Sequence, residues 1–158
     1  MISFKDAYHK VLALYQDFGL EQIPLETAMG RVLAEDIVAD RNFPPFNRAT
    51  KDGIAINYDA IENGLTSFKI EGVLAAGMPS QQLKDTSNCI EIMTGAVVPN
   101  NADTVVMYEH LIIENGAATL TKKPNKGQDI HLDGSDQKKG DLVLKKHCIL
   151  SASEIGIF

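Results

Sequence analysis

Apolar side chains near the N-terminus recur at intervals of three and four residues, at Phe4, Ala7, Val11, Tyr15 and Phe18. This spacing places them on one face of a helix. Ser3 stands at the capping position, Asp6 follows three residues later, and Gly19 is a natural terminator. The pattern predicts an amphipathic helix over residues 3–18 whose apolar stripe must be covered by another part of the protein.

The next forty residues change pattern several times. Residues 25–29 read as a short helical turn ended by Gly30, and residues 32–39 read as a strand with charged residues at its middle. Residues 40–53 then break every regular period with two prolines, two asparagines and a closing Asp-Gly. Polar loops of this length in a compact domain are usually functional or mobile, so we expect this segment to be a long loop.

Beyond residue 53 the apolar runs become short and are separated by turn residues. The candidate strands are 54–56, 68–76, 90–93, 104–108, 111–113, 118–122, 129–131 and 142–144. The Asn115-Gly116 pair predicts a hairpin over 111–122, because both residues tolerate positive φ. We therefore predict an α+β, mostly β fold: a barrel-like β domain inserted in a small discontinuous α/β domain, with an N-terminal helix.

The last residues have the pattern of a helix start. Ser151 stands at the cap and Glu154 follows three residues later, but the sequence ends at Phe158, about one turn further on. One turn of helix does not recover the cost of nucleation. We expect the natural chain to continue beyond Phe158.

Composition restricts the classes of function. The 158 residues carry 15 Lys+Arg and 21 Asp+Glu, a net charge of −6, and 44% are hydrophobic, as in a soluble globular protein. No basic cluster suits a nucleic acid, no apolar run reaches the roughly 18 residues of a membrane span, and no signal peptide is recognisable. Cys89 and Cys148 stand far apart, which favours free thiols in the cytoplasm, with a single disulfide left open.

Three loops combine polar side chains with glycine, at residues 50–53, 93–96 and 133–136. A small neighbour lets a ligand approach the backbone closely. Two carboxylates that converge can help to hold Mg²⁺, which favours one or two carboxylates with water and phosphate oxygens. The alternative reading is structural, since Asp-Gly is a common turn and aspartates often cap loops. The four histidines and two cysteines show no zinc-binding spacing, and no phosphate-binding loop or nucleophile elbow is present.

The loops and their flanks also form an ordered series of motifs. The series contains PLETAMGRVLAED (24–36), FPPFN (43–47), Asp52-Gly53, AAG (75–77), IMTGA (92–96) with Pro99, ADTVV (102–106) with Glu109, Gly134-Ser135-Asp136 with Gly140-Asp141, and SEIG (153–156). In this order the sequence resembles the molybdopterin molybdenumtransferase family, MoeA and the gephyrin E domain, over nearly its whole length.

The resemblance implies a Mg²⁺-dependent transferase of molybdenum cofactor biosynthesis. Such an enzyme takes molybdate and adenylylated molybdopterin, inserts molybdenum at the dithiolene and releases AMP. It also implies a cytoplasmic homodimer in which the cleft is shared with the pterin-binding domain of the other subunit. In the family that domain follows the segment that matches this chain. The resemblance therefore implies a molybdopterin molybdotransferase only for the full-length protein, and this chain alone is expected to be inactive.

The same resemblance implies a division into domains. Residues 1–19 form a helix that packs on the absent pterin-binding domain, residues 20–39 and 141–158 form a discontinuous elongated domain, and residues 40–140 form the barrel-like domain.

Site residues are carried over position by position. Asp52, Thr94 and Asp136 match cleft-lining residues and are the candidate catalytic residues, while Gly53 and Gly95 are the candidate cofactor-binding residues. Asp52 and Asp136 are the candidate metal ligands, and Thr94 is expected to hydrogen-bond an oxyanion. Without a cation, however, two carboxylates would repel the anionic substrates.

The sequence departs from the family pattern beside these residues. Lys51 and Ile54 replace the usual Met and Tyr around Asp52-Gly53, and Ser135 replaces the usual Glu before Asp136. Two other classes of function stay open at this stage: a dimerising protein-interaction or scaffold module, and an unrelated β-rich binder of a small molecule.

Overall fold

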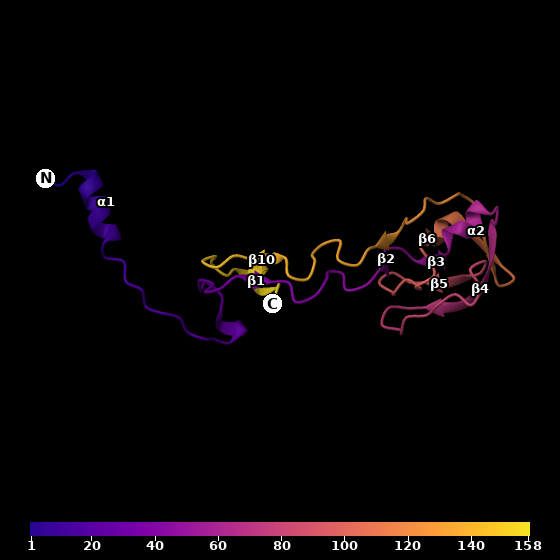
Figure 1. Ribbon diagram of the computed structural model, residues 1–158, viewed down its shortest axis with the longest axis horizontal. Coiled ribbons are helices and arrows are strands. Elements are labelled where there is room, and N and C mark those ends of the chain that lie inside the picture. The colour runs from indigo at the N-terminus through magenta and orange to yellow at the C-terminus, as the bar shows by residue number, and fades with distance from the viewer. The chain divides into compact units, whose positions relative to one another are not determined.

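A computed structural model describes residues 1–158, and the chain forms two compact units. The first unit comprises Met1–Ile37 with Leu142–Phe158, and the second comprises Val38–Asp141 (Figure 1). The domain limits expected from the sequence, 1–19, 20–39 with 141–158, and 40–140, concern the longer protein and stay a prediction.

The first unit begins with helix α1 (Phe4–Leu12), which is shorter than the predicted 3–18 helix. Ser3 is the N-cap as expected, and its hydroxyl oxygen accepts a hydrogen bond from the Asp6 amide at 3.2 Å. The prediction for Tyr15 and Phe18 was wrong, since both lie beyond the helix. No residue of α1 is buried. A helix this short gains most of its stability from packing, and nothing covers its apolar stripe here.

The rest of the first unit is sparse in regular structure. A 3₁₀ turn, η1 (Leu25–Thr27), forms where a helical turn was predicted. The predicted strand over 32–39 was wrong: it is reduced to an isolated bridge between Val32 and Ile149 and to β1 (Ile37–Val38), which pairs with β10 (Leu142–Leu144). The carboxylate of Asp36 accepts a hydrogen bond from the Lys146 amide at 2.8 Å, which adds a side-chain bond to the backbone bonds between the two segments.

The end of the chain forms the helix that its capping pattern predicts. Helix α3 (Ala152–Ile155) has Ser151 as its N-cap, and the Glu154 carboxylate accepts the Ser151 amide at 2.8 Å. None of the helices combines the length and the apolar composition that a membrane-spanning helix needs.

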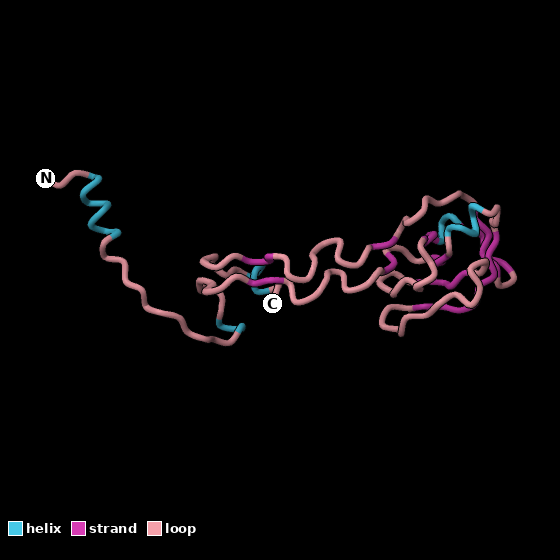
Figure 2. The backbone as a smooth tube through the Cα atoms, viewed as in Figure 1, coloured by secondary structure: helices cyan, strands magenta, loops and turns pink.

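The second unit is built on a six-stranded sheet that curls into an open half-barrel (Figures 1 and 2). Its strand order is β6-β3-β5-β4-β8-β7, and every neighbouring pair is antiparallel except β4 and β5. The strands are β3 (Gly53–Ile56), β4 (Ser67–Leu74), β5 (Cys89–Ile92), β6 (Thr104–Met107), β7 (Leu111–Glu114) and β8 (Ala117–Leu120). The predicted mostly-β class is confirmed.

A separate two-stranded ribbon leads into this sheet. It joins β2 (Arg48–Ala49) to β9 (Ile130–His131) in antiparallel register. The prediction of residues 40–53 as continuous loop was wrong at β2, because Arg48 and Ala49 alternate between an exposed and a buried side chain and Ala49 enters the core. Helix α2 (Tyr58–Glu62) and the 3₁₀ turn η2 (Tyr108–His110) were also not predicted.

Alternation along the central strands creates two hydrophobic clusters. Ile54 and Ile56 of β3 belong to one cluster with Phe68, whereas Ala55 belongs to the other with Val105. This alternation explains why both faces of β3 are buried. Cys89 lies fully inside the first of these clusters, and its burial raises the pKa of the thiol to about 12. Both cysteines are free, which resolves the open question of a disulfide.

The predicted hairpin is confirmed as β7–β8. Asn115 and Gly116 form its turn with φ of 52° and 74°, the pair of positive values that a type I′ turn requires.

Gly53 offers a direct test of this packing. A Cβ at Gly53 would overlap the carbonyl oxygen of Val106 on β6, whereas a Cβ at Gly72 on β4 would meet no atom within 4 Å. We predict that Gly53→Ala lowers the free energy of unfolding by about 2 kcal/mol or more, since overpacking at a backbone contact forces the strands apart. Gly72→Ala should cause no loss. Urea unfolding of both variants checks this, and equal stabilities would contradict the strand packing described.

Candidate functional site

Asp52 and Thr94 are held together by two hydrogen bonds in the second unit. The Oδ1 atom of Asp52 accepts the Thr94 amide at 2.7 Å and the Thr94 hydroxyl at 2.8 Å. The two residues are 42 positions apart in the sequence. The structure therefore brings these two predicted site residues into direct contact.

Two turns of the backbone place this pair. Asp52 lies in the turn between β2 and β3, and its carbonyl oxygen accepts the Tyr108 amide at 3.1 Å. Thr94 lies in the turn after β5, where the Ala96 amide bonds to the Met93 carbonyl at 3.0 Å and Gly95 has φ of 84°. This is the pattern of a type II turn, which requires a positive φ at the position that Gly95 occupies.

The second turn is also fixed to strand β2. The Gly95 amide donates to the Ala49 carbonyl at 2.9 Å, and the Ala49 amide donates to the Ala96 carbonyl at 3.0 Å. These bonds hold the Thr94 turn against the segment that leads into Asp52. Glycine is required for structural reasons at both predicted cofactor-binding positions. Gly95 adopts the positive φ of the turn, and at Gly53 a Cβ would overlap β6. Their cofactor-binding roles stay predictions.

The hydrogen bonds from Thr94 hold the pKa of the exposed Asp52 carboxyl below its ordinary value, the amide bond having the larger effect. Asp52 is thus a carboxylate at neutral pH, with Oδ1 occupied and Oδ2 left for a ligand. Both Thr94 donors are used by Asp52 in this structure. The expectation that Thr94 donates to a substrate oxyanion stays a prediction, and it requires Asp52 to release one of these bonds.

The neighbourhood of Asp52 is acidic. Tyr108 lies close enough to Glu91 and Asp52 that partial burial and these two carboxylates raise the pKa of its hydroxyl. A hydrogen bond between the phenol and Glu91 raises the pKa further, so the phenol stays protonated. An anion at this wall would meet negative charge unless a cation or a cationic side chain came with it.

Asp136 is positioned by a different set of contacts. Its loop is fixed to the 40–47 segment: the Asp136 amide donates to the Phe43 carbonyl at 2.9 Å, and the Gly134 amide donates to the Pro44 carbonyl at 2.9 Å. Asn42 and Asn47 add two side-chain bonds to Asp133, at 3.0 and 2.8 Å. Two asparagines of the predicted loop therefore act as clamps on the Asp136 loop.

The carboxylate of Asp136 is held at one oxygen. His131 Nε2 lies 2.7 Å from Oδ1, and the Ser135 hydroxyl donates to the same atom at 3.4 Å. On the other side of the imidazole ring, a guanidinium nitrogen of Arg48 lies 3.1 Å from His131 Nδ1. Asp136 thus resembles Asp52: two donors occupy Oδ1, and Oδ2 is left for a ligand.

No hydrogen bond or ion pair joins Asp136 to Asp52 or Thr94. All three belong to the second unit, and β2 links them: Arg48 contacts His131, while the next residue, Ala49, bonds to Gly95 beside Thr94. No group of three or more His, Cys, Asp or Glu side chains gathers as a metal site. The chain by itself therefore offers Mg²⁺ single carboxylate oxygens rather than a complete ligand set.

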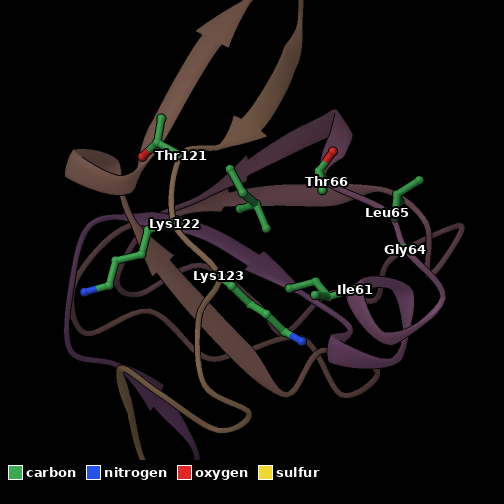
Figure 3. Close-up of a pocket in the computed structure, with 8 residues that line it drawn as sticks. Ile61, Gly64, Leu65, Thr66, Thr121, Lys122 and Lys123 are labelled. Carbon is green, nitrogen blue, oxygen red and sulfur yellow. The ribbon is translucent and has the colours of Figure 1, made fainter.

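The second unit also has a pocket of about 210 Å³ beside α2 and β8. Figure 3 shows Lys122 and Lys123 extending in different directions, and none of the predicted site residues lines the pocket. A wider hollow of about 770 Å³ in the first unit is lined mainly by residues 18–35. Neither space contains the candidate carboxylates, which lie on the surface of the second unit.

Sequence reasoning missed Arg48, His131 and the two asparagine clamps. The histidines were considered only as zinc ligands, and Arg48 was not singled out within the predicted loop. The Arg48–His131 contact depends on the pairing of β2 with β9. β9 lies within the predicted strand 129–131, but the two residues of β2 are too few to leave a periodic pattern in the sequence.

The fold and the site define a β-rich module that presents two exposed carboxylates and a threonine from loops. The profile of the family described as "MoeA N-terminal region (domain I and II)" matches residues 2–158. The chain therefore belongs to the MoeA family and corresponds to its N-terminal region, which confirms the resemblance seen in the motifs.

Individual relatives support the assignment to the MoeA family. The chain is 35% identical over 147 residues to a molybdopterin molybdenumtransferase of Synechocystis, covering 92% of this chain and 38% of that protein. It is 33% identical over 160 residues to one of Staphylococcus aureus, covering 99% and 38%. A crystal structure of a molybdopterin biosynthesis MoeA protein from Pyrococcus horikoshii matches with a TM-score of 0.83 at 30% identity, over 99% of this chain and 41% of that one. The chain thus spans about 38% of the curated relatives' length.

The Asp52–Thr94 contact predicts a change in titration. Thr94→Val removes the hydroxyl donor and keeps the amide, so the pKa of Asp52 should rise part of the way toward its ordinary value of 3.8. Because the folded pKa is depressed, the wild type loses stabilisation as the pH falls below about 3.8, and the variant should lose less.

Carboxyl ¹³C titration of both proteins measures this shift. Ser87→Ala is a matched control, because Ser87 lowers the pKa of Asp85 through the same pair of bonds. That variant should raise the pKa of Asp85 and leave Asp52 unchanged. An Asp52 titration curve that Thr94→Val does not move would show that the contact is absent in solution.

Proposed function

We propose that the chain is the N-terminal part of a molybdopterin molybdenumtransferase, which inserts molybdenum from molybdate into adenylylated molybdopterin and releases AMP. The proposal is supported by the names of the relatives, which are molybdopterin molybdenumtransferases at 33% to 35% identity. The relatives that have this activity by name are more than twice as long as this chain, so the activity is proposed for the full-length protein.

The main structural support for a role of this region in the reaction is that its two candidate carboxylates, Asp52 and Asp136, are held in the same way. Asp52 and Asp136 are each fixed by two hydrogen bonds to Oδ1, which leaves each Oδ2 oriented and unoccupied. A carboxylate held in this way pays little entropy on binding a ligand. Both residues come from loops that are clamped to neighbouring segments, as a preorganised site requires.

The same geometry fits Mg²⁺ bound together with a substrate. Mg²⁺ usually takes one or two carboxylates and completes its shell with water and substrate phosphates. In our proposal Asp52 and Asp136 would hold the cation through those carboxylate oxygens, and the pyrophosphate of adenylylated molybdopterin would complete its ligand set. The cation, when bound, neutralises charge on the pyrophosphate. It would also remove the repulsion between the acidic wall and the anionic substrates.

The remaining part of the site is proposed to come from outside this chain. We expect a homodimer in which a pterin-binding domain of the other subunit faces the Asp52–Asp136 wall, in the cytoplasm. This would explain why the candidate carboxylates lie on an open surface. The chain alone should then release no AMP from adenylylated molybdopterin.

A substitution series in the full-length protein tests the site. With molybdate, Mg²⁺ and adenylylated molybdopterin, Asp52→Asn and Asp136→Asn should each slow AMP release about 100-fold, as the loss of a charged group in the reaction does. Asp85→Asn is the matched control, because Asp85 is exposed and also accepts two bonds at Oδ1. It should keep the wild-type rate.

Two outcomes would contradict the proposal. Wild-type rates in both site variants would remove these carboxylates from the reaction. A full-length wild-type protein that releases no AMP under these conditions would favour the protein-interaction module instead.

A further inference from the structure

We propose that Arg48 and His131 are positioning residues that act through Asp136: Arg48 donates to Nδ1 of His131 and so holds the ring in the orientation in which its Nε2–H donates to the Asp136 carboxylate. This inference rests on the proposed function in one respect, since it takes Asp136 as part of the reaction site. The hydrogen-bond geometry itself is independent of that assignment.

The chemistry of the three groups determines the direction of both bonds. A guanidinium has only donors, so the contact of 3.1 Å between Arg48 and His131 Nδ1 requires Nδ1 to be the acceptor. A carboxylate without its proton has only acceptors, so Nε2 must carry the hydrogen that it shares with Asp136 Oδ1 at 2.7 Å. The arrangement therefore requires a hydrogen on Nε2 and a lone pair on Nδ1.

Backbone structure supports the contact between Arg48 and His131. The two residues are directly opposite each other in the antiparallel β2–β9 pair, and Arg48 also forms a bridge with Val97. Cross-strand partners at this position hold their side chains side by side. The His131 side chain is only 28% exposed, so the ring has limited freedom to turn away.

The Arg48 side chain is available for the contact with His131 because no carboxylate competes for it. Arg48 forms no ion pair with a carboxylate, whereas Arg41, the next arginine toward the N-terminus, pairs with the adjacent Asp40. Without Arg48, Nδ1 loses its donor and the ring is held only through Nε2. The imidazole can then turn more freely, and the strongest bond that fixes Oδ1 becomes weaker.

The consequence for Asp136 is a change of orientation. Its side chain is 57% exposed, and Ser135 contributes only a long bond of 3.4 Å. His131 is therefore the main group that keeps Oδ2 directed outward. Groups that orient a ligand in this way typically change affinity or rate by 10- to 100-fold when they are removed.

The spectroscopic test reads the tautomer directly. Full-length protein labelled with ¹⁵N-histidine is measured at pH 8 by two-bond ¹⁵N–¹H correlation, with His131→Gln used to assign the signal. We expect His131 to carry its proton on Nε2 in the wild type, and Arg48→Met to keep that tautomer but shift the ¹⁵N resonance of Nδ1, which has lost its hydrogen-bond donor. A wild type protonated on Nδ1, or an Arg48→Met spectrum identical to the wild type, would overturn the inference.

The kinetic test asks whether the arrangement matters for the reaction. Arg48→Met and His131→Leu should each lower kcat for AMP release about 10-fold, by analogy with groups that orient metal ligands. His131→Gln should recover most of the rate, because its amide can donate to Asp136 where leucine cannot. Arg41→Met, which changes an exposed arginine elsewhere, should keep the wild-type rate.

The two tests separate this inference from the proposed function. If Asp136→Asn is fully active, the assignment of Asp136 to the reaction fails, while the ¹⁵N measurement still decides the role of Arg48. If Asp136→Asn is inactive but His131→Leu retains full activity, the positioning role is wrong and the proposed function stands. A rate for His131→Gln as low as that of His131→Leu would also overturn the role as a hydrogen-bond donor.

Discussion

The bond pair between Asp52 and Thr94 is the interaction on which the candidate site depends. It joins the turn before β3 to the turn after β5, and the Thr94 turn is in turn bonded to β2 at Ala49. Because the amide and the hydroxyl of one residue meet one carboxylate oxygen, both turns adopt a single arrangement. The rest of the site can be traced from this point along β2 to Arg48, His131 and Asp136.

The two halves of the site use the same physical solution with different residues. In each, donors occupy Oδ1 of an exposed aspartate and leave Oδ2 for a ligand. The donors at Asp52 come from one threonine, whereas Asp136 depends mainly on a histidine whose ring is held on its other side by an arginine. The wall is acidic, and the substrates of the proposed reaction are anions, so a cation bound with the substrate is needed to make the arrangement attractive rather than repulsive.

Much of the β structure could be predicted from the sequence. Apolar runs such as 54–56 and 104–107 are long enough to indicate that their side chains are buried in strands. The Asn115-Gly116 turn and the Ser151 cap were equally readable, since each depends on local chemistry. The helix was overestimated beyond Leu12 because its stripe has no partner in this chain. Asp52, Thr94 and Asp136 were found through motif order, but the Arg48–His131 contact was not, since it arises only when β2 and β9 pair.

The most direct test of this account is a crystal structure of the full-length protein with adenylylated molybdopterin and Mn²⁺ in place of Mg²⁺, with the metal located by its anomalous signal. We predict Mn²⁺ coordinated directly by Oδ2 of both Asp52 and Asp136, together with oxygens of the substrate. A substrate and metal bound elsewhere, with both Oδ2 atoms facing bulk water, would contradict it.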